Sequence, residues 1–242
     1  MSGPLTPPRP EVVLLDVGGV FLLPEPDRVA AVFARSGFEV PGPVMLEAHY
    51  VGTTAFTTTY EGDLPWREFW HEYLMRFARA CGVPEVRLAE VVEHLEGEFA
   101  TGRLWSHVID GAREGLEELK ATGVAVGIVS NADGHVAQDL RALEILQVGP
   151  GLGVDVSCVI DSGAVGVEKP DPRIFKIALD AIDATPDVCW YVGDTPGIDV
   201  VGAVRAGIYP VLMDPFDVHG DRNELRIHSL HECAARVAAL RA

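Results

Sequence analysis

The chain has 242 residues, of which 48% are hydrophobic and 23% are charged, as in globular proteins that bury a core. Its formal net charge of −17 excludes the basic surface on which nucleic-acid binding depends, so we expect no nucleic-acid partner. No apolar run reaches the roughly 20 residues of a membrane-spanning helix, so we expect no membrane partner. The proline-rich residues 1–10 lack the apolar centre of a secretion signal; we expect them to be a disordered tail of a cytoplasmic protein.

Short, continuous apolar runs recur along the chain. They cover residues 12–15, 124–129, 156–160, 188–192 and 208–212. Strands of a parallel sheet are buried on both faces and therefore read as continuous rather than alternating hydrophobic runs. The pattern predicts an α/β fold, namely a Rossmann-like parallel sheet with helices on both faces.

Amphipathic stretches between these runs predict the crossover helices. The first has a buried stripe over residues 112–119, with Asp110 as its expected cap and Gly123 as its end. Pro172 is expected to open the second, and the third should cover residues 198–207. Each helix would cover one face of the sheet.

The interval 24–106 does not follow this alternation. Its patterns are helical, as in Phe69, Trp70 and Tyr73, so we expect an inserted all-helical domain. Residues 11–23 and 107–242 would then form the α/β core domain. An insertion directly after the first strand would lie over the carboxyl ends of the sheet, where open α/β sheets bind their ligands.

Polar residues stand at or near the ends of predicted strands in four segments of the chain. They occur in the segments 16–20, 130–131, 169–170 and 193–199. Because parallel strands bring these ends together, carboxylates, a hydroxyl and an ammonium should converge in one crevice. Such a group is costly to bury unless a cation and an anionic substrate compensate it, as magnesium and phosphate would.

In chain order these segments read LLDVGGV, IVSNA, VEKPDPRIF and YVGDTPGID, and they resemble the four motifs of the haloacid dehalogenase superfamily. The segment YEGDLPWREFW also resembles the helical cap of a subgroup that includes phosphatases related to the N-terminal domain of soluble epoxide hydrolase. The resemblance implies a hydrolase with a helical cap over a Rossmann-like core.

The resemblance also implies the role of each residue. Asp16 would be the nucleophile and Lys169 would hold the transferring group. Mg²⁺ would be bound by Asp16, the backbone carbonyl of Gly18, Asp194 and, through water, Asp199. The substrate would be bound by Ser130, Asn131 and Gly19. The expected partner is a small phosphorylated metabolite, and the protein would be a monomer or a homodimer.

One position departs from the family pattern. Most phosphatases of the superfamily carry an aspartate two positions after the nucleophile as general acid and base, and here that position is Gly18. Three alternatives follow: a phosphatase or phosphotransferase whose leaving group needs little protonation or which takes an acid from the cap, a 2-haloacid dehalogenase that needs no acid, or a catalytically weak binding protein. The first is favoured because Asp194 and Asp199 are retained and indicate a metal.

Overall fold

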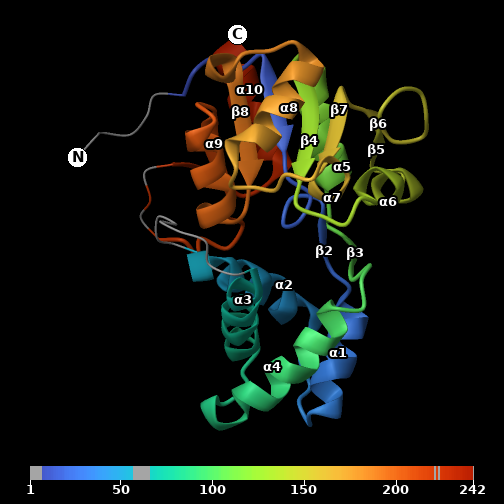
Figure 1. Ribbon diagram of the computed structural model, residues 1–242, viewed down its shortest axis with the longest axis vertical. Coiled ribbons are helices and arrows are strands. Elements are labelled where there is room, and N and C mark those ends of the chain that lie inside the picture. Colours follow the sequence, from blue (N-terminus) through green and yellow to red (C-terminus); the bar gives the residue numbers. More distant parts are fainter. Residues whose placement is uncertain (1–6, 57–65, 221, 223, 242) are drawn as a thin grey trace.

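The computed structural model describes residues 7–56, 66–220, 222 and 224–241 (Figure 1). Its centre is a six-stranded sheet with the order β10-β9-β8-β1-β4-β7, and every neighbouring pair is parallel. The strands are β1 (Val12–Leu15), β4 (Ala125–Ser130), β7 (Cys158–Asp161), β8 (Cys189–Gly193), β9 (Tyr209–Met213) and β10 (Leu225–Ile227). The predicted α/β class is confirmed, and the five predicted strands are shifted by no more than two residues.

Strand β1 shows why its sequence is apolar throughout. Val13 and Leu15 belong to one hydrophobic cluster, whereas Val12 and Leu14 belong to another. Successive side chains of a strand point to opposite faces, so each face of the sheet has its own core.

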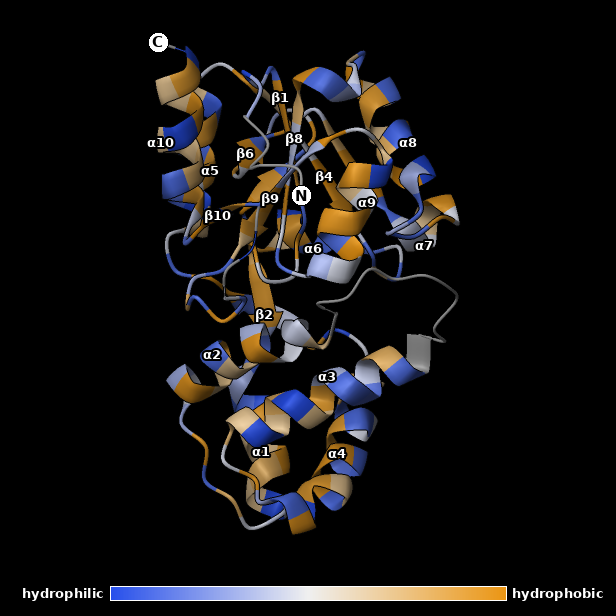
Figure 2. Ribbon diagram, turned by 90° about the vertical axis from the view of Figure 1, so that its left-hand side faces the viewer, coloured by the Kyte–Doolittle hydropathy of each residue, from blue (hydrophilic) through white to orange (hydrophobic). Residues whose placement is uncertain are grey.

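Helices cover the two faces (Figure 2). Helices α5 (Ala112–Ala121) and α10 (Leu230–Arg241) lie together on one face, and α8 (Pro172–Ile182) and α9 (Val201–Arg205) cover the other. Shorter elements complete the core: α6 (Val136–Ala142), α7 (Ser162–Val165), η2 (Pro186–Val188), the π-helical turn η3 (Pro196–Val200), and the paired strands β5 (Leu146–Gln147) and β6 (Val154–Asp155).

Two details differ from the sequence-based expectations. Gly111, with φ 75°, is the N-cap of α5 and no side chain caps this helix, so the predicted capping role of Asp110 is wrong. Within the expected disordered tail, the carbonyl of Pro8 accepts a hydrogen bond from Trp190 Nε1 and that of Pro10 from Arg241, at 3.0 and 2.8 Å. Residues 7–10 are therefore attached to the core, and residues 1–6 lie outside the described part of the chain.

Four helices of the described part of the chain lie between strands β2 (Leu22–Pro24) and β3 (Trp105–Val108), which pair antiparallel. They are α1 (Pro26–Arg35), α2 (Gly42–Thr53), α3 (Trp66–Ala80) and α4 (Glu85–Phe99), with the short η1 (Thr54–Phe56) after α2. We call residues 26–99 the helical segment. It has its own hydrophobic cluster, including Phe33, Phe77 and Leu95, and lies beyond one end of the sheet (Figure 1). No helix among the described residues is long and apolar enough to cross a membrane.

Candidate active site

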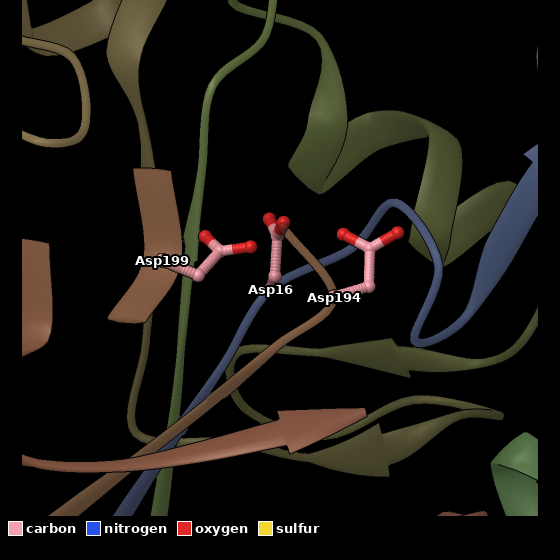
Figure 3. A group of neighbouring side chains, drawn as sticks. All are labelled: Asp16, Asp194 and Asp199. Carbon is pink, nitrogen blue, oxygen red and sulfur yellow. The ribbon is translucent and has the colours of Figure 1, made fainter. Parts of the chain in front are cut away.

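Three aspartates meet at the carboxyl ends of the central strands (Figure 3). Asp16 directly follows β1, Asp194 directly follows β8, and Asp199 lies in η3. Each offers a carboxylate oxygen, and these oxygens lie within 4.8 Å of one another. The three residues are 8%, 3% and 1% exposed. The topology thus brings together acidic residues almost 180 positions apart.

Lys169, from the loop before α8, is the cation of this cluster. Its Nζ lies 2.8 Å from Asp16 Oδ1 and 2.8 Å from Asp199 Oδ1, and it donates a hydrogen bond to Tyr191 Oη. Burial disfavours the ammonium, but the two carboxylates outweigh burial and raise the pKa of Lys169. Lys169 therefore stays charged and bridges two of the three carboxylates.

One lysine leaves the negative charge of three buried carboxylates incompletely balanced. Burial raises the pKa of Asp16 to about 7, against its ordinary value of 3.8; Lys169 opposes this shift, and Asp199 and Asp194 add to it. Asp16 Oδ1 also has no partner with hydrogen-bond geometry among the described residues, although Lys169 Nζ is close. Hard oxygen ligands with unbalanced charge fit a divalent cation such as Mg²⁺.

The three aspartates differ in how many hydrogen bonds their carboxylate oxygens already accept. Asp199 Oδ1 is held by Lys169 and Tyr191, and its Oδ2 accepts the backbone N–H of Thr195 at 2.9 Å. This arrangement makes Asp199 a support for Lys169 and for the loop, and it agrees with an indirect contribution to metal binding. Asp16 and Asp194 keep oxygens that a cation could reach, and their role as direct ligands, like that of the Gly18 carbonyl, stays a prediction.

The residues expected to bind the substrate lie in different surroundings. Ser130, the last residue of β4, is buried and lines the same cavity as Asp16. The Asn131 side chain bonds to both the backbone N–H and the carbonyl of Lys169, so in this structure it positions the Lys169 loop. Gly19 donates its N–H to Leu22 O and lines a different cavity, so its expected contact with substrate has no support here.

Sequence reasoning missed His49 and Trp105, which lie against the site. His49 of α2 places Nε2 at 2.7 Å from Asp194 Oδ2 and Nδ1 at 2.8 Å from Tyr73 Oη. Trp105 of β3 lies over Gly18, since a Cβ built on this glycine would be 3.3 Å from Trp105 Cζ3. The indole therefore takes the space next to the position at which the family carries its acid.

Asp161, at the end of β7, was also missed. Its carboxylate accepts backbone N–H groups of Gly134, Val136 and Gly163 at 2.9 to 3.1 Å. It thereby fixes the loop after Ser130. The signal was present, because Asp161 follows an apolar run just as Asp16 does.

These groups surround a cavity of about 390 Å³. Its floor is formed by the carboxylates, Lys169 and Ser130, and the helical segment and β3 supply aromatic side chains on another side. This volume is within the range of small-molecule sites, about 300–1,000 Å³. The cavity can therefore hold a small substrate against Asp16.

A parallel α/β sheet with a lysine-bridged aspartate site at its carboxyl edge is the arrangement expected of the haloacid dehalogenase class of hydrolases. The chain belongs to this class: the family model for haloacid dehalogenase-like hydrolase matches residues 10–207. The phosphoserine phosphatase of Thermus thermophilus is 33% identical over 193 residues, covering 77% of this chain and 72% of that protein. Haloacid dehalogenase-like hydrolase domain-containing protein 3 of Mus musculus is 32% identical over 155 residues, 62% of this chain and 59% of that protein.

The chain thus spans less than two thirds of the mouse relative. Among solved structures, a putative HAD-hydrolase from Bacillus subtilis, bound to magnesium, superposes with a TM-score of 0.57 at 18% identity and covers 95% of this chain and 99% of that one. A 2-haloacid dehalogenase from Pseudomonas syringae has a TM-score of 0.53 at 19% identity, with 96% of this chain and all of that one covered. At such identities these structures show the fold alone. The resemblance to the epoxide-hydrolase subgroup stays a prediction, and residues 60–65 of its segment lie outside the described ranges.

Proposed function

We propose that this hydrolase is a magnesium-dependent phosphatase or phosphotransferase that acts on a small phosphorylated metabolite. The observation that carries the proposal is the contact of Lys169 Nζ with Asp16 Oδ1 at 2.8 Å, beside two further buried carboxylates within 4.8 Å. Relatives named phosphoserine phosphatase and glyceraldehyde 3-phosphate phosphatase support phosphate esters as the substrate class.

In the first step an Asp16 oxygen attacks phosphorus, the bond from phosphorus to the leaving oxygen breaks, and its electron pair departs with that oxygen. In the second step water attacks the phosphorus of the aspartyl-phosphate. The bond to Asp16 breaks, the carboxylate is restored and the water proton passes to the released phosphate. For a phosphotransferase, an acceptor hydroxyl replaces the water.

The protein's own groups act on charge and position. Lys169 places a fixed positive charge against the transferring group, and Ser130 lines the same floor. Asp16 and Asp194 would hold Mg²⁺, which when bound supplies the positive charge that offsets repulsion between the nucleophile and a phosphate dianion. Asp199 keeps Lys169 in place.

The replacement of the usual acid by Gly18 selects among substrates. Loss of a positioned general acid typically costs about 10²- to 10⁴-fold when the leaving group needs a proton. Esters whose leaving group departs as a stable anion escape this cost. The same glycine keeps the second candidate, a 2-haloacid dehalogenase, in consideration, because halide leaves carbon without a proton.

The test compares substrates and variants. Purified protein with acetyl phosphate or phenyl phosphate and Mg²⁺ should release phosphate, and Asp16→Asn should lower this rate at least about a thousandfold. Asp180→Asn, on the exposed face of α8, is the matched control and should leave it unchanged. Chloride release from 2-chloropropionate without phosphate release would establish the dehalogenase instead, and no turnover of either would point to a binding protein.

A further inference from the structure

One part of the cavity lining is an aromatic wall. Trp70 and Tyr73 of α3, Phe99 at the end of α4 and Trp105 of β3 all line it. The Trp70 ring lies 5.2 Å from that of Tyr73, 6.0 Å from Phe99 and 6.5 Å from Trp105, measured between centroids. Aromatic side chains packed in this way offer large, rigid apolar contact area at low conformational-entropy cost.

This wall begins directly over the nucleophile's loop. Trp105 stands over Gly18, and its ring also meets the His49 ring edge-on, with centroids 5.4 Å apart. The leaving group of a phosphate attacked by Asp16 would therefore meet hydrocarbon rather than a carboxylic acid. His49 is engaged at both ring nitrogens, by Tyr73 and Asp194, so neither nitrogen is free to serve as the acid at that place.

The charges around the cavity disfavour a second anionic group on the substrate. Among the described lining residues the permanently charged bases are Lys169, which is already shared between two carboxylates, and Arg103, which is exposed, and the acidic residues of the lining outnumber them. Asp133, Asp139 and Glu168 add negative charge to the lining. An uncharged group is therefore favoured beyond the phosphate.

Building on the proposed function, we infer that the site takes a phosphate ester whose leaving group is a flat, uncharged aromatic alcohol, held against the wall formed by Trp70, Tyr73, Phe99 and Trp105. An Asp16 oxygen bonds to phosphorus, the phosphorus to aryl-oxygen bond breaks, and the electron pair leaves on the phenolate, which takes its proton from water. A phenolate is a much weaker base than an alkoxide, so this step needs no acid at Gly18.

Binding tests the aromatic subsite without turnover. Calorimetry with Mg²⁺ present should show phenylphosphonate binding at least about tenfold more tightly than methylphosphonate, because the ring is removed from water against the wall. Trp70→Leu should lower this ratio at least about threefold. Phe33→Leu in α1, in the core of the helical segment and outside the cavity lining, should leave the ratio unchanged.

Turnover separates this inference from the proposed function. Phenyl phosphate should be hydrolysed at least about a hundredfold faster than ethyl phosphate. Acetyl phosphate should also be hydrolysed, but it should bind less tightly than phenyl phosphate because it has no aromatic ring. If acetyl phosphate is hydrolysed through Asp16 but the phenyl-to-methyl binding ratio is near one, the aromatic subsite is wrong and the phosphatase stands. If no ester is hydrolysed while the binding ratio stays high, the subsite stands and the phosphatase is wrong. The wild-type ratio decides the inference even if Trp70→Leu does not fold.

Discussion

His49 Nε2 lies 2.7 Å from Asp194 Oδ2, and this contact joins helix α2 to the loop after β8. Both side chains are almost completely buried, 3% and 4% exposed. Because Tyr73 Oη meets the other ring nitrogen, a chain of hydrogen-bonding groups runs from α3 through α2 to the carboxylate cluster. The helical segment therefore contacts the site at a predicted metal ligand.

This contact predicts how His49→Ala changes stability. In EDTA the variant should lose about 1–3 kcal/mol of unfolding free energy, because Asp194 is left buried without its partner. With saturating Mg²⁺ the loss should shrink, since a cation bound to Asp194 compensates the same charge. Urea unfolding with and without Mg²⁺ measures both values.

His71→Ala is the matched control for this experiment. His71 makes a comparable contact with Glu96, 2.8 Å, but both side chains are about half exposed. An exposed pair of this kind contributes about 0–1 kcal/mol. Its loss should be small and independent of Mg²⁺. A His49→Ala penalty that is equal in EDTA and in Mg²⁺ would argue against a cation at Asp194.

The pKa of Asp16, raised by burial from 3.8 to about 7, predicts a pH dependence of stability in the absence of divalent cations. Between these values the unfolded carboxyl is ionised while the folded one retains its proton. The folded state then binds more protons, so the contribution of Asp16 to stability falls as pH rises through this window.

Asp16→Asn removes this titration. In EDTA the stability of the wild type relative to Asp16→Asn should therefore decrease from about pH 5 to about pH 7. Mg²⁺ favours the ionised carboxylate and should reduce the decrease. Thermal unfolding of both proteins across this range provides the measurement. A stability difference that does not change with pH would be inconsistent with a buried Asp16 carboxyl of raised pKa.

The close packing of α5 on α10 predicts that even a methyl side chain at position 115 destabilises the protein. A Cβ there would be 2.7 Å from Leu230 Cβ and 2.8 Å from the backbone N of His231. Gly115→Ala should lower the unfolding free energy by about 1–3 kcal/mol through overpacking. Gly97→Ala in α4, where nothing lies within 4 Å, should raise it by about 0.5–1 kcal/mol. Equal effects in urea unfolding would show that the two helices are not packed this closely.

The strands and their exits could be predicted because the signals are local. Residues 12–15 and 189–193 are apolar throughout since they are buried on both faces, and Asp16 and Asp194 follow them directly. Parallel topology then brings these ends together. The same reasoning would have found Asp161, which follows its own apolar run.

His49 and Trp105 could not be predicted in this way. His49 is 145 positions from Asp194 in sequence, and a histidine in an apolar helix has the same local pattern whether it serves a core or a site. Trp105 reaches Gly18 only because β3 pairs with β2 and returns the chain to the sheet. Such contacts depend on how the helical segment lies against the core, which no short sequence pattern determines.

Trapping the phosphorylated intermediate decides whether Asp16 attacks phosphorus in a site that binds a divalent cation. The protein is mixed with phenyl phosphate and Mg²⁺, quenched in acid within one turnover, digested and analysed by mass spectrometry. We expect one added phosphoryl group on the peptide that contains Asp16, and no such group with EDTA or in Asp16→Asn. Phosphate release by the Asp16→Asn variant, or a phosphoryl group on another residue, would show that Asp16 is not the nucleophile.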